Sequence, residues 1–479
     1  MGNVVIPGLI DAHCHFSGFA RTFAWIDLVG TESLNEVLDS LEKWVKYTPP
    51  REWIRGRGWD QNDWKDSRFP TAKDLDRVSP ENPVLLTRIC GHAAVVNSLA
   101  LELCDITPDT PDPEGGKIVR DSDGNPTGLL LDNAIDLVER KIPPMSDSRL
   151  KELLIKACNE CLSVGLVGCH EMGIDSHLAG LYLELYNSHS LPFRITAYYS
   201  ATESDLDSVL ATEVLREAGD GYFSVVGVKF FADGSLGARS AALLSDYSDD
   251  PGNKGILVTE PEVLLSSMMK VHRSGYQIAV HAIGDRANRL VLDIFEKILK
   301  EALVKDPRFR IEHAQVVSPD DIERFCRLGV IPSMQFVHAT SDMPWAEDRL
   351  GPDRIKGAYA WRSFRETGCR IPGGSDFPVE SINPFLGIYA AVTRKDLSGS
   401  PAGGWYPEQC LSVEEAIRSF TVDAVYASFE ESMRGSLEAV KFADFVVLPV
   451  DIMSIDPSLI PEIKPLATVV GGEIVFGSL

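Results

Sequence analysis

The sequence lacks long hydrophobic runs and basic clusters. No apolar stretch approaches the roughly 20 residues that a helix needs to cross a bilayer, and the first residues lack a basic region and a signal cleavage site. The 479 residues include 46 Lys and Arg against 70 Asp and Glu, a formal net charge of −24. This charge would oppose the binding of polyanions. We therefore expect a soluble cytoplasmic protein with neither a nucleic-acid nor a membrane partner.

The cysteines of the chain show no pattern typical of disulfide bonds. Nine cysteines, an odd number in a long chain, do not fit a disulfide framework, so we expect reduced thiols. The single CxxC motif, formed by Cys158 and Cys161, lies on the apolar face of a predicted helix. Without a second pair of ligands, this motif indicates two small core residues rather than a zinc or redox site.

Strand-like and helix-like segments alternate along most of the chain. Several predicted helices end at a glycine, as at Gly165, Gly275, Gly329 and Gly368, and an apolar strand follows at once. Eight strands can be read in order: IPGLIDAHCH, LVGCHEM, FRITAYY, VVGVKFF, YQIAVHA, FRIEHAQ, VIPSMQF and CRIPGGSD. This order predicts an α/β fold, a (β/α)8 barrel of the TIM type, whose active site lies at the carboxyl ends of the strands.

Two regions depart from the alternation. The first and second strands are too far apart for one crossover, which predicts an inserted small α+β domain over residues 49–135 that covers the substrate site. After about residue 430, two segments read as antiparallel strands of a small C-terminal β-domain. The predicted domains are the barrel start at 1–48, the insert at 49–135, the remaining barrel at 136–430 and the β-domain at 431–479.

Polar residues close several of the apolar strands. His13 and His15 close the first strand, where side chains two apart point to the same face. Lys229 lies within the apolar run VVGVKFF, where a lone ammonium is costly. His281, His313 and Asp376 close three later strands. Each residue alone could be structural, as a hydrogen-bonding histidine, an ion-paired lysine or a cap of the glycine turn, but together they indicate a metal site.

The series of motifs resembles the amidohydrolase superfamily, in particular the branch that includes N-substituted formamide deformylases. The resemblance rests on the strings PGLIDAHCHF, GHAAVVNSLAL, GGKIVRDSDGNPTGLLLDNA, GVKFFADGSLGARSAAL, HAIGDRA, IEHAQ, GSDFP and FADFVVL. It implies a metal-dependent hydrolase on a distorted barrel, with an inserted domain and a small β-sandwich built from both chain ends. Because Val4 reads as part of the first barrel strand, we expect only half of this sandwich. Cys90 stands where the family pattern typically has an aspartate.

The resemblance also implies the metal chemistry. His13, His15 and Asp376 would hold one divalent ion, and His281 and His313 a second. Lys229 would bridge the two ions as a carbamate formed with carbon dioxide. Zinc is the expected metal, with iron, manganese and cobalt as alternatives. We expect a water activated by the metals to attack a small amide or N-substituted formamide, and Asp376 to transfer its proton to the departing amine.

Several alternatives remain at this point. A single ion with unmodified Lys229 is one, and a mononuclear deaminase of an aminated ring is another, although HAIGD supplies no glutamate after the fifth strand. A non-catalytic scaffold conflicts with the complete ligand set. A homodimer is compatible with these expectations. The substrate-contacting candidates, chosen for their places at strand ends, in following loops or in the insert, are Trp59, His92, His170, Glu171, Arg239 and His338.

Overall fold

The computed structural model describes residues 3–89, 93–113, 115–201, 206–211, 220–301 and 306–478. The chain divides into two compact units, and the division falls within helices α1 (Phe16–Thr22) and α6 (Asp147–Ser163). Unit 1 comprises residues 1–17 and 154–479, and unit 2 comprises residues 18–153. Among the described residues, no helix combines the length and the apolar character needed to cross a bilayer.

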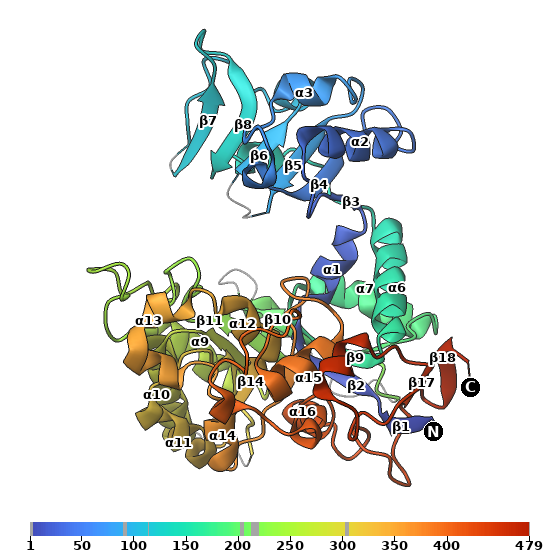
Figure 1. The fold of residues 1–479 in the computed structure, drawn as a ribbon, viewed down its shortest axis with the longest axis vertical. Coiled ribbons are helices and arrows are strands. Elements are labelled where there is room, and N and C mark those ends of the chain that lie inside the picture. The colour runs from blue at the N-terminus through green and yellow to red at the C-terminus, as the bar shows by residue number, and fades with distance from the viewer. Residues whose placement is uncertain are drawn as a thin grey trace. The chain divides into compact units, whose positions relative to one another are not determined.

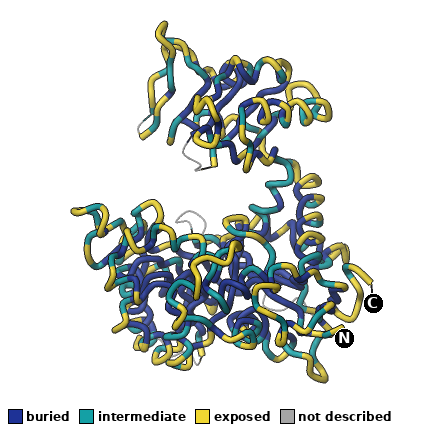
Figure 2. The backbone as a smooth tube through the Cα atoms, viewed as in Figure 1, coloured by how far each residue is buried: buried dark blue, intermediate teal, exposed yellow. Residues whose placement is uncertain are grey.

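Unit 1 contains a nearly closed barrel of eight parallel strands, as predicted. The strands follow one another around the barrel in chain order: β2 (Leu9–Cys14), β9 (Leu166–Ile174), β10 (Arg194–Ser200), β11 (Phe223–Phe231), β12 (Gln277–Ala282), β13 (Arg310–His313), β14 (Ile331–Gln335) and β15 (Gly373–Gly374). Their residues are almost all buried, which explains the continuous apolar runs in the sequence. Figure 2 shows these strands as the buried interior of the unit.

The barrel strands alternate with helices, which Figure 1 shows on the outside for α10 and α11. These helices are α7 (Ser176–Asn187), α8 (Leu206–Leu210), α9 (Pro261–Arg273), α10 (Asp285–Glu301), α11 (Pro319–Leu328), α12 (Phe336–Asp342), α13 (Ala346–Arg354), α14 (Trp361–Glu366), α15 (Pro384–Thr393), α16 (Val413–Ser419) and α17 (Val422–Ala427). The four predicted glycine stops have left-handed φ angles between 67° and 88°. The prediction that glycine ends these helices is therefore confirmed.

Backbone bonds between β2 and the segment after β15 bring the ends of the barrel together. The amide of Asp376 donates to the carbonyl of His13 over 2.8 Å, and the amide of His15 donates to Phe377 over 2.8 Å. The buried carboxylate of Asp11 accepts the Ser375 hydroxyl over 2.6 Å. The first and last strand ends, far apart in sequence, are therefore fixed side by side.

A four-stranded antiparallel sheet in unit 1 joins both ends of the chain. Its order is β1 (Val4–Pro7), β16 (Phe445–Leu448), β17 (Ala467–Val470) and β18 (Glu473–Gly477). The antiparallel C-terminal strands are confirmed, but the assignment of Val4 to the first barrel strand is wrong. Val4 pairs with Leu448, and the barrel strand begins at Leu9. The strand breaks at Gly8, so one apolar run in the sequence serves two sheets.

Unit 2 is a mixed α/β unit around a six-stranded sheet. The sheet order is β3 (Trp25–Asp27), β4 (Ile54–Trp59), β5 (Val84–Arg88), β6 (Ala93–Val96), β8 (Pro126–Asp132) and β7 (Gly116–Arg120). Its helices are α2 (Leu34–Val45), α3 (Ala72–Asp76), α4 (Ser98–Leu103) and α5 (Asp136–Glu139). The predicted hairpin is confirmed by the antiparallel pairing of β7 with β8.

The insert is longer than the predicted 49–135. The segment predicted as the barrel start, 1–48, contains α2, whose Val37 and Leu41 pack in one core cluster with Ile26 and Ile54 of unit 2. An apolar helix face does not show which of two cores it covers, so the sequence pattern alone misplaced this helix.

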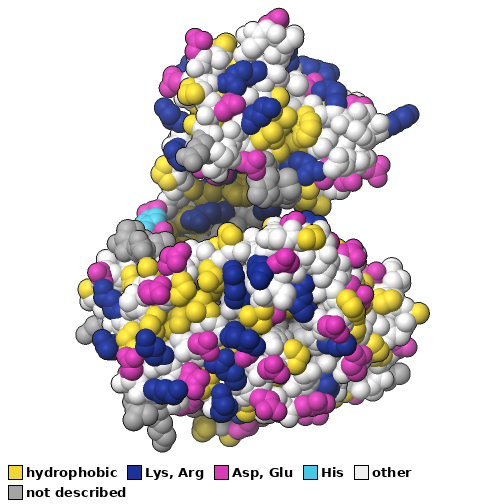
Figure 3. All heavy atoms as spheres, turned by 90° about the vertical axis from the view of Figure 1, so that its left-hand side faces the viewer, with side chains coloured by type: hydrophobic (Ala, Val, Ile, Leu, Met, Phe, Trp, Pro, Cys, Tyr) yellow, Lys and Arg dark blue, Asp and Glu magenta, His cyan; other side chains and the backbone are white. Residues whose placement is uncertain are grey.

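On the face drawn in Figure 3, acidic and basic side chains are interspersed, so the net negative charge forms no single patch there.

Candidate metal centre

The six residues predicted as metal ligands lie at or near the carboxyl ends of barrel strands. They lie on β2, β11, β12 and β13 or in the segments directly after β2 and β15: His13, His15, Lys229, His281, His313 and Asp376. In a parallel barrel these strand ends form one rim, which is where side chains from different strands can meet. The fold therefore places the predicted set on the same side of the barrel.

Asp376 lies next to both histidines of the first strand. Its Oδ1 atom is 3.4 Å from His13 Nε2 and 3.2 Å from His15 Nε2. Burial would raise the pKa of Asp376, but the nearby His13 and His15 side chains hold that pKa well below its ordinary value. The carboxylate is therefore anionic at neutral pH, as a metal ligand must be.

His313 and His281 extend the same cluster. The ring of His313 lies 4.7 Å from the ring of His13 and 4.6 Å from the ring of His281, measured between centroids. Burial lowers the pKa of His281 to about 3 and that of His313 well below its ordinary value. Both imidazoles are therefore neutral and have lone pairs for a metal.

The backbone is unusual at two of these positions. His313 has φ 74° and Asp376 has φ 61°, in the left-handed region that residues other than glycine rarely adopt. In a regular strand, neighbouring side chains point to opposite faces. The left-handed backbone at His313, the last residue of β13, changes the direction of its side chain from that regular pattern. Such strain commonly occurs where a site requires a particular side-chain direction.

Lys229 is fully buried in β11, and among the described residues its Nζ atom has no hydrogen-bond partner. Burial lowers the pKa of its amine to about 8, although the charges of Glu312 and Asp376 oppose this change. A buried cation without a hydrogen-bonded partner is costly. The absence of a hydrogen-bond partner among the described residues is consistent with the prediction that a lone ammonium is costly at this position.

The residues present fit a divalent metal. Ligand atoms of His13, His313 and Asp376 all lie within 4.8 Å of one another. His13 Nε2 and Asp376 Oδ1 are buried and make no hydrogen bond with any described residue. Buried polar atoms are normally satisfied, so converging unsatisfied nitrogen and oxygen atoms indicate a missing partner. Imidazole and carboxylate are suitable ligands for zinc and similar ions.

Two residues that the sequence reasoning missed orient the histidines. The Nδ1 atom of His13 lies 2.5 Å from Glu312 Oε2, and that of His313 lies 2.7 Å from Gln335 Oε1. Burial would raise the pKa of Glu312, but Arg310 and His13 beside it lower that pKa below its ordinary value. These contacts leave the Nε2 atoms of both histidines available. Glu312 directly precedes His313 in the predicted strand FRIEHAQ, which is a signal that could have identified it.

Asp233 is a third missed residue, in the loop after β11. Its buried carboxylate accepts the amides of Ile283 and Gly284, over 2.9 and 2.8 Å, and lies 3.6 Å from His281 Nε2. Burial raises its pKa to about 7. His281 Nε2 also lies 3.2 Å from the carbonyl of Gly234, so Nδ1 is the nitrogen left for a ligand.

The predicted substrate residues of the barrel have protein partners. Arg310 donates to His170 Nδ1 over 2.9 Å, while Glu171 accepts from the amide of Ser17 over 2.8 Å and from the Tyr182 hydroxyl. Arg239 forms an ion pair with Asp249 over 2.8 Å. These contacts give the three side chains structural roles, and their contact with substrate stays a prediction.

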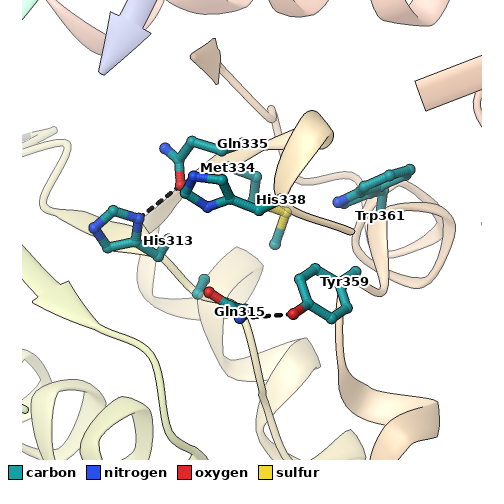
Figure 4. A pocket seen from close by; sticks show the side chains of 8 residues that line it. His313, Gln315, Met334, Gln335, His338, Tyr359 and Trp361 are labelled. Carbon is teal, nitrogen blue, oxygen red and sulfur yellow. Dashed lines mark hydrogen bonds between the residues drawn. The ribbon is translucent and has the colours of Figure 1, made fainter. Parts of the chain in front are cut away.

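His338 lies closer to the cluster. It follows β14 on α12, and its ring is stacked 6.2 Å from the ring of His313. Figure 4 shows both rings in a small pocket that Gln315, Gln335 and Tyr359 also line. His338 Nε2 is buried and makes no hydrogen bond with the described part of the chain. The structure therefore places one predicted substrate residue beside His313, a candidate metal ligand.

The predictions for the insert have a different outcome. Trp59 is completely buried in the core of unit 2, where its ring lies 6.1 Å from that of Trp64 and its Nε1 donates to the Leu86 carbonyl. The prediction that Trp59 contacts substrate is therefore wrong, because this large aromatic side chain at the end of β4 fills the core of unit 2 instead. His92 lies outside the described residues.

Comparisons with known proteins show the family to which the chain belongs. The signature of the Amidohydrolase family matches residues 1–476. The protein YtcJ of Bacillus subtilis (strain 168) is 36% identical over 486 residues, which cover 99% of this chain and 89% of that protein. N-substituted formamide deformylase of Arthrobacter pascens is 28% identical over 485 residues, covering 98% of this chain and 88% of the relative.

Solved structures show the same likeness. An uncharacterized metal-dependent hydrolase from Pyrococcus horikoshii OT3 aligns with a TM-score of 0.81 and 29% identity, over 95% of this chain and 88% of that chain. The barrel and its cluster of histidine and carboxylate groups define the class of metal-dependent hydrolases. The chain belongs to the amidohydrolase family.

Proposed function

We propose that this protein is a metal-dependent amidohydrolase that hydrolyses a non-peptide C–N bond in a small amide, with N-substituted formamides as the first substrate class. The observation that carries the proposal is the convergence of His13, His313 and Asp376, whose ligand atoms lie within 4.8 Å of one another at the barrel rim. The relative from Arthrobacter pascens, named as an N-substituted formamide deformylase, supports the substrate class.

The ligand set has enough members for two ions, preferably zinc. His13, His313 and Asp376 form the closest group, while His15 and His281 lie beside it. A divalent ion there would polarise the amide carbonyl and lower the pKa of a water from roughly 16 to about 7.

Lys229 would complete the ligand set as a carbamate. Its neutral amine would form a bond from Nζ to the carbon of carbon dioxide and release one proton, which leaves an anion with two oxygens. The pKa of about 8 makes the neutral amine accessible at mildly alkaline pH. The buried surroundings of Lys229 would then hold an anion next to the metal ligands rather than an isolated ammonium.

Asp376 is the residue placed to move protons. Its carboxylate is anionic at neutral pH, and among the described residues its Oδ1 atom makes no hydrogen bond. It would accept the proton of the attacking water and return that proton to the nitrogen of the departing amine. This transfer balances the reaction, because an amide and water give a carboxylic acid and an amine.

An apolar surface beside the ligands supports a substrate with a hydrophobic group. Phe231 ends β11, the residue is 41% exposed, and its ring lies 5.6 Å from the ring of His281. Lys229 Nζ lies 4.9 Å from the same ring. Phe231 would therefore contact an apolar N-substituent of a substrate held at the ligand cluster, a role that the sequence reasoning gave to Trp59.

A substrate panel tests the proposal. The protein would be loaded with zinc, manganese or cobalt and offered N-benzylformamide, an N-acyl amino acid, a cyclic amide and a phosphate ester. We expect formate release from the formamide, loss of this activity in Asp376→Asn, and retained activity in Lys300→Met, which changes an exposed charged residue of α10. Metal content measured on the same samples should give two ions in wild type and fewer in Lys229→Ala. Preferential cleavage of the phosphate ester would contradict the proposal.

A further inference from the structure

Arg310 and Glu312 form a buried charge pair inside the barrel. The two residues are two apart on β13, and neither side chain has exposed surface. Arg310 Nε donates to Glu312 Oε1 over 2.7 Å, and its Nη2 donates to Oε2 over 3.1 Å. A buried pair of this bidentate kind has a defined geometry, and removing one member leaves an uncompensated charge.

The Arg310 guanidinium also donates to residues of four other barrel strands. Its Nη2 donates to the Ala12 carbonyl of β2 over 2.7 Å and to Ser333 Oγ of β14 over 3.0 Å. Its Nη1 donates to His170 Nδ1 of β9 and to the Tyr198 hydroxyl of β10, each over 2.9 Å. The guanidinium position is therefore fixed by five strands, and the Glu312 carboxylate is fixed with it.

The fixed carboxylate determines how His13 can bind a metal. Glu312 is held as an acceptor by Arg310, and its Oε2 lies 2.5 Å from His13 Nδ1. The shared hydrogen then belongs to Nδ1, so the lone pair is on Nε2, which lies 3.4 Å from Asp376 Oδ1. His313 has only a neutral partner in the same role, since its Nδ1 donates to the amide oxygen of Gln335.

We propose that Glu312, held in place by Arg310, is a positioning residue that fixes the tautomer of His13 and thereby sets the metal affinity of the centre. The inference rests on the proposed metal centre, but it concerns zinc binding and not hydrolysis. Residues that orient a ligating histidine in this way typically change metal affinity by about 10- to 100-fold when they are replaced. A loss of this size is expected for Glu312→Gln.

Zinc affinity, measured by competition with a chromogenic chelator in the absence of substrate, tests the inference. The control is Glu171→Gln, which neutralises another buried carboxylate whose partners are Ser17 and Tyr182. We expect Glu312→Gln to bind zinc 10- to 100-fold more weakly and Glu171→Gln to bind like wild type. Side-chain nitrogen NMR of the metal-free protein should show a hydrogen on Nδ1 of His13 in wild type and a mixture of tautomers in Glu312→Gln.

If the unpaired Arg310 prevents Glu312→Gln from folding, a double variant tests the same inference. Glu312→Gln with Arg310→Met removes both buried charges, so a purely structural role for the pair predicts full zinc affinity. We expect the double variant to fold and still to bind zinc weakly. Wild-type affinity in either folded variant, or an equal loss in Glu171→Gln, would overturn the inference. Failure to hydrolyse any amide would leave these affinities unchanged and would count only against the proposed function.

Discussion

Replacement of Lys229 by methionine probes the buried amine of β11. Burial lowers the pKa of this amine from 10.5 to about 8. A pKa decrease of that size means that the folded state disfavours the charged ammonium form by about 3 kcal/mol. Methionine has a similar length and no charge, so we expect metal-free Lys229→Met to be more stable than metal-free wild type at pH 7, by up to about 3 kcal/mol.

The difference should depend on pH in a defined direction. Below about pH 8, the lysine is charged in both the folded and the unfolded chain, and the full cost is present. As the pH rises from about 8 to 10.5, the folded protein holds a neutral amine while the unfolded chain still binds a proton. The stability of wild type therefore increases relative to Lys229→Met, and the advantage of the variant should decrease.

Urea unfolding followed by tryptophan fluorescence, with a chelator present, measures this difference between pH 7 and roughly pH 9.5. Lys300→Met is a matched control, because Lys300 lies on α10 with 72% of its side chain exposed, and its replacement should change the unfolding free energy little. A wild type at least as stable as Lys229→Met at pH 7, or a stability difference that is constant with pH, would contradict this prediction. In the metal-loaded protein the same variant should lose one ion and nearly all turnover.

Three further substitutions separate catalysis, specificity and stability. Asp376→Asn should lower kcat by about 10²- to 10⁴-fold in a folded protein, because a proton-transferring carboxylate is lost. Formate release measures kcat, and a near-normal value would mean that another residue transfers the proton. Phe231→Ala should raise KM for N-benzylformamide about tenfold and leave KM for N-methylformamide nearly constant, since only the larger substituent reaches the ring. Equal changes of KM for both substrates would contradict the proposed contact between Phe231 and the N-substituent. Trp59→Ala should lower the unfolding free energy of unit 2 by about 3 to 5 kcal/mol without changing KM, as expected for a core tryptophan. A variant of unchanged stability with a raised KM would instead indicate that Trp59 contacts substrate.

The sequence alone identified the barrel and the candidate ligands. Buried parallel strands appear as continuous apolar runs, and a polar residue within or at the end of such a run is conspicuous, as with Lys229 and His281. Glycine stops such as Gly329 mark helix ends because they depend on local backbone geometry. These signals are local in the chain, so they could be read without knowledge of tertiary contacts.

The tertiary structure decided which residues meet and which core each element joins. The contact between Glu312 and His13 spans 299 positions in sequence, and no local pattern predicts such a pairing. The assignment of α2 to unit 2, and of Trp59 to its core, depended on which apolar surface was available to cover them. Apolar periodicity shows that a face is buried, but only long-range packing determines against what it is buried, because the hydrophobic effect is non-directional.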